Sequence, residues 1–541
     1  MNVRIWAGIC LTVASISVPV IAAEASYHDL FSAHFAAEEP GAVVLVSRQG
    51  ETLYRAAFGK ADLSLDVALT DDMVFPIGSV SKQFTSVAIL QLMEQGKLTL
   101  DDTIQQHLPD FPQLSHPITI RQLLSHTSGL ENYIARHEWR EHWRNDFTLS
   151  EMRQHYVHYP LKFAPDQHFD YSNSGYLVLA EIIEHLSGLS YGDYVTERLF
   201  APAGMKQSYQ LDNYTVIPGM PRGYIPHGSG YRLADFVSMT QMIGPGSLAS
   251  TLDDLQHWDQ ALFNGQLISK ESLQQALSSH TLNNGSATGY GLGWEVRSIR
   301  GRPSFEHGGY MYGYFSTVLT MPEQGIMVAI LTNSRKTDPR ELAVQAAAMA
   351  LNEPFPQPEL VALTGDMAEQ WVGVYLDEHG VERTIGLFND ELYIRRGAGR
   401  MWPLQPSAAG YLHYEEGLSY LALTGDGTLE LHQREGVMSR SQRKTAQVAP
   451  LNTVSLTPAQ LKALTGVYQL AETFALHVFT EDNRLFIQGT GQNAGEVFAL
   501  SATHLISITD AVEFEFEQDE TGAVTTLRLL QGGQTFLAPK N

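Results

Sequence analysis

Apolar and polar positions divide the chain into two regions with different periodicity. In the first region, strand-like runs lie near both ends and segments with helical spacing lie between them. The expected strands are two within 41–54, around a turn at 48–51, and three more at 290–296, 315–321 and 325–332. The expected helices are 149–159, 176–186 and 341–351, one that begins near Ser79 and a short one capped by Thr119. This order predicts an α+β domain in which helices flank an antiparallel sheet.

The second region begins after a proline-rich stretch, expected as a linker over 353–366, and alternates apolar and polar residues between turn residues. Two patterns recur there at an offset of 93. Gly373-Val374-Tyr375 returns as Gly466-Val467-Tyr468, and Leu392-Tyr393-Ile394 returns as Leu485-Phe486-Ile487. The repeat predicts two small antiparallel β-barrel modules of eight strands, at 367–446 and 458–541, joined by a link over 444–457.

The N-terminal 23 residues stand apart from both regions. Arg4 is their only charged residue, an apolar run follows it, and small residues end the run at 22–25. This pattern predicts a signal peptide over 1–23 and an exported protein, periplasmic or secreted; an uncleaved membrane anchor is the alternative. The only cysteine, Cys10, lies inside this segment. The mature chain would therefore have no disulfide and no cysteine-based metal site.

Charge limits the classes of partner. The 541 residues include 35 Lys and Arg against 59 Asp and Glu, a formal net charge of −24. Loss of Arg4 with the signal peptide leaves 34 basic residues and a net charge of −25. Such a chain repels nucleic acid and anionic lipid, so we expect neither nucleic-acid binding nor membrane contact beyond the export signal. The sequence gives no indication of the oligomeric state.

Ser79 and Lys82 are the first candidate for chemistry. Three residues apart at the start of a helix, they share one face, which brings a hydroxyl beside an amine. The apolar helix around Lys82 can lower its pKa enough for the amine to activate the serine. The same spacing recurs at Ser441 and Lys444 in a polar, basic stretch, which we interpret as a solvated linker.

Two further motifs follow in order along the chain. Tyr171 and Asn173 form a Y-x-N tripeptide, in which a tyrosine of lowered pKa can shuttle protons and an asparagine can hold both lysine and substrate. A tyrosine packed under a turn is the structural alternative. The third motif, His307-Gly308-Gly309, follows a strand-like run, and its glycines would let a substrate backbone lie close to that strand.

With S-x-x-K, Y-x-N and H-x-G in this order, the region from 26 to 352 resembles the β-lactamase-related serine hydrolases. That family includes class C β-lactamases, D-Ala-D-Ala carboxypeptidases, D-aminopeptidases and certain esterases. The segments 123–130, 290–294 and 332–333 also fit the family, and the C-terminal modules resemble lipocalin-like barrels. The resemblance implies a β-lactamase-like catalytic domain over 26–352.

The family also implies roles for the matching residues. Ser79 would form an acyl-enzyme, Lys82 would accept its proton, and Tyr171 would relay protons to the leaving group and later activate water. Asn173 would orient the substrate, and His307 would replace the lysine of the K-T-G motif found in many relatives.

The backbone N–H groups of Ser79 and Tyr310 would form the oxyanion hole, and Gly308 and Gly309 would lie along the substrate. The resemblance implies no metal and no cofactor.

Two positions depart from the family pattern. Gly308 stands where relatives that recognise a free carboxylate carry a hydroxyl residue, and Asp166 replaces the glycine of a common Pro-Gly pair. The histidine motif and the two barrels most resemble the D-aminopeptidase branch, so we expect a small peptide, amide or ester substrate. An esterase, a weak β-lactamase and a non-catalytic binding or sensing protein are the alternatives.

Three other patterns compete with this interpretation. Ser190 lies in a G-x-S-x-G match, but a helix rather than a strand is expected before it. His137 and His142 are one residue too far apart for a zinc-protease motif. His155 and His158 could share a helix face, but no third ligand accompanies them, so we interpret them as a surface pair.

Overall fold

The computed structural model describes residues 20–541 except 357, 398, 416, 493, 510, 511, 532 and 533. Residues 1–19 of the predicted signal peptide therefore lie outside the described part, and residues 20–23 begin the helix α1 (Val20–Ser32). The chain forms two compact units, and the boundary between them falls between Phe355 and Pro356. Each unit is described by itself.

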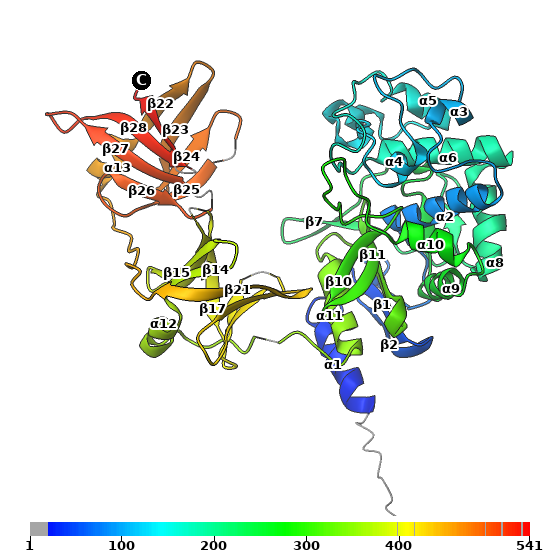
Figure 1. Ribbon diagram of the computed structural model, residues 1–541, viewed down its shortest axis with the longest axis horizontal. Coiled ribbons are helices and arrows are strands. Elements are labelled where there is room, and N and C mark those ends of the chain that lie inside the picture. Colours follow the sequence, from blue (N-terminus) through cyan, green and yellow to red (C-terminus); the bar gives the residue numbers. More distant parts are fainter. Residues whose placement is uncertain are drawn as a thin grey trace, which may run out of the picture. The chain divides into compact units, whose positions relative to one another are not determined.

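The first unit is built on a six-stranded antiparallel sheet in the order β10-β11-β12-β13-β1-β2 (Figure 1). Its strands are β1 (Ala42–Arg48), β2 (Glu51–Phe58), β10 (Glu295–Ile299), β11 (Arg302–Met311), β12 (Tyr314–Met321) and β13 (Ile326–Thr332). The first strand of the chain thus pairs with the last strand of the unit, with Ala42 opposite Thr332. The predicted α+β class, with an antiparallel sheet and flanking helices, is confirmed.

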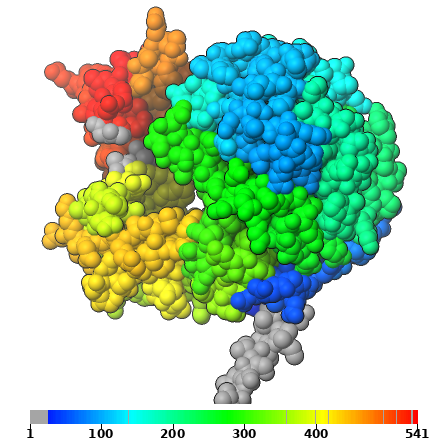
Figure 2. Space-filling model, turned by 45° about the vertical axis from the view of Figure 1, so that its right-hand side comes forward, coloured from blue at the N-terminus to red at the C-terminus, as the bar shows by residue number. Residues whose placement is uncertain are grey.

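Helices cover this sheet and form a second layer beside it. The main ones are α2 (Ser81–Glu94), α4 (Ile120–Leu124), α5 (Leu149–Gln154), α6 (Asn173–Ser187), α9 (Leu252–Phe263) and α11 (Pro339–Ala350). Apolar residues of β1 and α9 share one core with α2 and α6, and α11 contacts β12 and β13. Sheet and helices form one continuous body, coloured blue to green in Figure 2.

Most predicted elements of the first unit are present, with two shifts in boundary. The strand expected at 290–296 is β10, which begins only at Glu295. The residues before it form a loop because Gly291 meets the Ala276 carbonyl and Gly293 takes a φ of +93° against α2. The helix expected over 149–159 ends at Gln154. Thr119 caps α4, as expected.

The second unit consists of two consecutive eight-stranded modules, which confirms the predicted pair of barrels. The first is closed and contains β14 (Gly373–Asp377), β15 (Glu382–Phe388), β16 (Glu391–Arg396), β17 (Met401–Pro406), β18 (Leu412–Tyr414), β19 (Tyr420–Leu423), β20 (Leu429–Gln433) and β21 (Gly436–Thr445). The second contains β22 (Gly466–Ala471), β23 (Phe474–Glu481), β24 (Arg484–Gly489), β25 (Ala494–Ala499), β26 (His504–Ser507), β27 (Val512–Gln518), β28 (Val524–Gln531) and β29 (Gln534–Pro539). A bridge between Tyr468 and Lys540 connects its first and last strands.

The two modules share one register. Gly373 pairs with Ile385 in the first module, and Gly466 pairs with Val478 in the second, at the same offset of 93. A short helix precedes each module, α12 (Gly365–Trp371) and α13 (Pro458–Leu464). The repeat seen in the sequence is therefore a repeat of structure.

The interpretation of Ser441 and Lys444 as part of a solvated linker is wrong. Both residues belong to β21, which closes the first barrel, and Ser441 is buried. Successive side chains of a strand point to opposite faces, so residues three apart cannot meet as they would on a helix.

Candidate active site

Ser79 lies on a tight turn between a strand and a helix, where another strand approaches closely. The turn η1 (Gly78–Val80) connects β5 (Phe75–Pro76) to α2. Gly78 has a φ of +49°, and a Cβ atom there would lie 2.8 Å from both N and O of Tyr310. A Cβ atom at Gly309 would lie 2.0 Å from the Ile77 carbonyl oxygen. The two glycines thus let the backbone of β11 run directly beside the half-buried Ser79.

Lys82 is fully buried one turn further along, and its amine faces three oxygens. Nζ lies 3.1 Å from Ser79 Oγ. Two carbonyl oxygens accept from the same nitrogen, Asn173 Oδ1 at 2.8 Å and Pro245 O at 2.9 Å. A neutral amine has two hydrogens and one lone pair. In this neutral form the two carbonyls take the hydrogens and the lone pair faces the Ser79 hydroxyl, whereas the protonated amine donates to all three oxygens.

Burial also favours the neutral form of this amine. Loss of hydration lowers the pKa of Lys82 well below its usual range, because the charged form is the one that burial penalises. No carboxylate is recorded within ion-pair distance of Lys82 among the described residues. The ring of Tyr171 lies 4.7 Å from Nζ and contributes to the enclosure.

The pKa of Tyr171 is raised, whereas the sequence predicts a lowered one. Burial raises the pKa of this phenol above its usual range, and a hydrogen bond with Ser79 opposes the rise only in part. The expected lowering of the tyrosine pKa by the nearby lysine is absent because Lys82 is itself shifted towards the neutral amine. Tyr171 is therefore a neutral phenol that holds its proton.

Two residues that the sequence analysis did not single out fix the Tyr171–Asn173 segment. The Asn132 amide donates to the Tyr171 carbonyl at 3.3 Å, and its oxygen accepts from the backbone N–H of Asn173. His126 Nδ1 accepts from the Ser172 N–H at 3.1 Å, and its ring lies 4.2 Å from that of Tyr171. Burial lowers the pKa of His126 well below its usual range, so it accepts this bond as a neutral ring.

His307 is buried and neutral. Burial is the main cause and lowers its pKa to about 3. The neutral ring is fully satisfied, because Nδ1 donates to the Gly308 carbonyl at 2.6 Å and Nε2 accepts from the Tyr290 hydroxyl at 2.9 Å. His307 thus occupies the third motif without the positive charge that a lysine would bring there.

Gly308 leaves room for another side chain. A Cβ atom at this position would lie 2.9 Å from Cδ of Arg340, so the stem of that arginine fills the space. The Arg340 guanidinium is exposed and is paired with Asp338 at 2.6 Å. Position 308 therefore offers no hydroxyl, and the adjacent cation already has a carboxylate partner.

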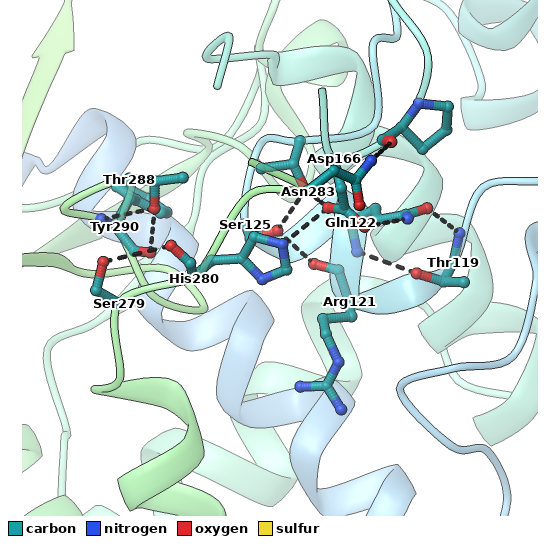
Figure 3. Close-up of polar contacts among 12 residues, drawn as sticks. Thr119, Arg121, Gln122, Ser125, Asp166, Ser279, His280, Asn283, Thr288 and Tyr290 are labelled. Carbon is teal, nitrogen blue, oxygen red and sulfur yellow. Dashed lines mark hydrogen bonds and ion pairs between the residues drawn. The ribbon is translucent and has the colours of Figure 1, made fainter. Parts of the chain in front are cut away.

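Asp166 connects the loops on both sides of the site (Figure 3). It has a φ of +61°, a conformation that glycine adopts easily and aspartate rarely does. Its carboxylate accepts from Gln122 Nε2 at 2.6 Å, from Thr127 Oγ1 at 2.7 Å and from His280 Nε2 at 2.8 Å. The backbone of Asn283 donates to the Asp166 carbonyl at 2.9 Å.

These contacts hold the loop before Tyr171 against α4 and against the loop that leads to Tyr290, which contacts His307. Asp166 is thus a positioning residue that touches no reacting atom.

The structure brings the predicted residues together: Ser79, Lys82, Tyr171, Asn173, His307, Gly308, Gly309 and the backbone of Tyr310. Asn132 and Pro245 were missed because they act through one amide and one backbone carbonyl, which carry little sequence signal. His126 and Tyr290 lie in segments that fit the family, and Asp166 stands out in the sequence only as a departure from a common Pro-Gly pair.

The competing motifs do not form sites. Ser190 follows α6 and caps α7 (Tyr191–Val195), so its hydroxyl accepts from the Asp193 N–H. The interpretation of His155 and His158 as a surface pair is wrong, because His155 packs against Trp139 and His142 while His158 is exposed. In the part of the chain that the structure describes, no group of three or more His, Cys, Asp or Glu residues could hold a metal ion.

The role of Asp166 can be tested by restoring glycine. Asp166→Gly keeps the φ of +61° accessible but removes three side-chain hydrogen bonds, so we expect the Tyr171 loop to shift. Displacement of a catalytic group by about 1 Å lowers kcat by about 10²-fold, and we expect a loss between about 10- and 100-fold in ester or anilide turnover. Asp66→Gly is the matched control, because Asp66 also has a positive φ but an exposed side chain. Wild-type activity in Asp166→Gly would contradict the positioning role.

The neutral state of His307 predicts an acid sensitivity of the fold. Its pKa is about 3 when folded and 6.5 otherwise, so between these values the unfolded state binds a proton that the folded state does not. Stability therefore rises with pH across this window and falls as the solution is acidified. We expect this one group to contribute about 2 to 3 kcal/mol to the loss between pH 7.5 and pH 4.5. Urea denaturation of wild type and His307→Gln at both pH values measures it; an identical loss in both proteins would show that His307 does not titrate in this way.

Comparison with known proteins agrees with this geometry. The β-lactamase family model matches residues 29–352. Penicillin-binding protein 4* of Bacillus subtilis is 31% identical over 398 residues, which are 68% of this chain and 86% of that protein. D-aminopeptidase of Brucella anthropi is 29% identical over 62% of this chain and 64% of its own length.

Two solved structures share the fold. The octameric penicillin-binding protein homologue from Pyrococcus abyssi has a TM-score of 0.54 at 23% identity, covering 78% of this chain and all of that one. D-amino acid amidase from Ochrobactrum anthropi has a TM-score of 0.53 at 22% identity, covering 62% of this chain and 99% of that one. From the family match and the identity with the Bacillus protein, the chain belongs to the β-lactamase family of serine hydrolases.

Proposed function

We propose that the protein is an exported serine hydrolase that acts through an acyl-enzyme on a peptide, amide or ester, as a D-aminopeptidase does. The observation that carries the proposal is the position of the Lys82 amine. It lies 3.1 Å from Ser79 Oγ, and both of its hydrogens are held by carbonyl oxygens. A nucleophile and an uncharged base are thus assembled before substrate arrives.

Acylation begins with transfer of the Ser79 proton to the lone pair of Lys82 as Oγ bonds to the substrate carbonyl carbon. The negative charge that develops on the carbonyl oxygen is stabilised by the backbone N–H groups of Ser79 and Tyr310. Tyr171 donates its phenolic proton to the leaving amine or alkoxide as the scissile bond breaks. Lys82 then returns a proton to Tyr171, which leaves a neutral amine and an ester on Ser79.

Deacylation uses the same groups in reverse. A water molecule gives a proton to the pair formed by Tyr171 and Lys82 while its oxygen attacks the ester carbon, and Ser79 regains its proton as the acid leaves. The raised pKa of Tyr171 suits its part in acylation, because a phenol that retains its proton can donate that proton to the leaving group at neutral pH. Asn173 orients the substrate through the part of its amide that does not hold Lys82.

The third motif supports an amide or ester substrate over one that is recognised by a free carboxylate. Gly308 has no hydroxyl, and the neighbouring Arg340 is engaged by Asp338. His307 is neutral and adds no cation. Similarity to D-aminopeptidase of Brucella anthropi supports the same choice. An esterase or a weak β-lactamase on the same scaffold is the alternative.

Export is proposed from residues 1–23, which have the pattern of a signal peptide. Among the described residues, no helix has both the length and the apolar character needed to cross a membrane.

Covalent labelling tests the nucleophile. A fluorophosphonate should label the wild-type protein and Ser190→Ala equally, since Ser190 only caps a helix. Ser79→Ala should lose the label, and Lys82→Ala should label at least 10²-fold more slowly because its serine has no base. Mass spectrometry of the labelled peptide locates the adduct.

A label on Ser190 would show that the assignment is wrong. A binding or sensing protein without catalysis is the other class to exclude. Turnover of any p-nitrophenyl or p-nitroanilide substrate that is lost in Lys82→Ala would exclude it, and a screen of D- and L-aminoacyl amides, short-chain esters and a cephalosporin would identify the substrate class.

A further inference from the structure

The mouth of the first barrel gathers positive charge in a chain that is otherwise strongly acidic. A cavity of about 600 Å³ opens there. It is lined by Arg383, Ile394, Arg395, Arg396, Gly399, Arg400, Trp402, Tyr414, Ser419, Leu431, Gln433 and Met438. Four of these residues are arginines and none of the described lining residues is an aspartate or a glutamate, although the whole chain has a formal net charge of −24.

Most of these arginines have no carboxylate partner. Arg383 pairs with Asp377 at 3.1 Å. For the other three, no ion pair is recorded among the described residues, and Arg396 lies on the same face of the sheet as Arg383, whereas Arg395 lies on the opposite face. Arg383 also lies directly opposite Arg396 on paired strands. Asp377 offsets only one of these two charges, and the uncompensated charge of Arg396 favours a bound anion.

The second barrel shows that the fold does not require these charges. At the offset of 93, Arg395 and Arg396 correspond to Gln488 and Gly489, and Arg383 corresponds to Leu476. The cavity at the mouth of that barrel, about 530 Å³, has no charged residue among the described residues that line it. The two copies therefore share a register but differ in the chemistry of their mouths.

The cavity of the first barrel also has an apolar and aromatic wall. The Arg400 guanidinium carbon lies 3.9 Å from the centre of the Trp402 ring, and 43% of Trp402 is exposed. Trp402 lies opposite Ile394 on the neighbouring strand, and Tyr414 and Leu431 also line the cavity. A guanidinium stacked on an aromatic ring keeps its edge N–H groups free for an anion.

We propose that the mouth of the first barrel binds an anionic amphiphile, a molecule with a carboxylate or phosphate group attached to an apolar chain or ring. Arg396 and Arg400 contact the anionic group, and Trp402 and Ile394 contact the apolar part. The cavity volume falls within the range of small-molecule sites, and an eight-stranded barrel can hold one small ligand at its mouth. Such a site shares no lining residue with the site at Ser79.

Calorimetry on the full-length protein tests the proposal with four soluble probes. Octanoate and octyl phosphate carry both features, octanol lacks the charge, and inorganic phosphate lacks the chain. We expect both anionic amphiphiles to bind at least about tenfold more tightly than octanol or phosphate, since each charge-assisted contact contributes about one order of magnitude in affinity. Equal binding of octanol, or of phosphate alone, would overturn the proposal.

Variants locate the site. Arg396→Gln and Arg400→Gln should each weaken octyl phosphate binding by about tenfold, with a far-ultraviolet spectrum and a Tm close to those of wild type. Arg440→Gln is the matched control: it removes the same charge from the same barrel, but Arg440 is exposed, pairs with Glu430 and does not line the cavity. Unchanged binding in both cavity variants would overturn the proposal. Binding of phosphatidylglycerol vesicles without binding of monomeric octyl phosphate would also overturn the proposal, because the protein would then recognise the anion only on a membrane surface.

Discussion

The catalytic site depends on the burial of one amine. Lys82 belongs to the buried helix α2, and its side chain is fully buried, so a permanent charge there would be unfavourable in free energy. The fold meets this constraint with two carbonyl oxygens, one from Asn173 and one from Pro245. The helix α6 and the loop before β9 (Leu248–Ser250) supply these oxygens, and the burial of His307 keeps that ring neutral as well. The first two motifs are far apart along the chain but meet at this nitrogen, which contacts Ser79 and Asn173.

The same reasoning accounts for the backbone around the site. Gly78 and Gly309 let two backbones touch, which is how a strand from the end of the unit reaches a serine near its beginning. Asp166 shows the reverse case, a residue in a conformation suited to glycine that is retained by three side-chain hydrogen bonds. In the second unit, the repeat preserves register and core, while the mouths of the two barrels differ at positions such as 396 and 489.

Much of this was predictable from sequence because periodicity and motif order are local signals. The paired strands around residue 50, the cap at Thr119 and the repeat at an offset of 93 all follow from residues close together in the chain. The errors concern tertiary context. Burial, which the sequence does not display, raises the pKa of Tyr171. Close contacts of Gly291 and Gly293 with residues distant in the chain delay the start of β10. Asn132 and Pro245 contribute one amide and one backbone carbonyl, which no motif identifies.

The most direct test of this account is the ionisation of Lys82 itself, measured by nuclear magnetic resonance of protein labelled with ¹³C and ¹⁵N in lysine. The signal is assigned by its absence in Lys82→Met. The account predicts an amine that loses its proton at a pH well below the usual lysine pKa of 10.5. A lysine that stays charged up to about pH 10 would contradict it, because the base beside Ser79 would then have no lone pair.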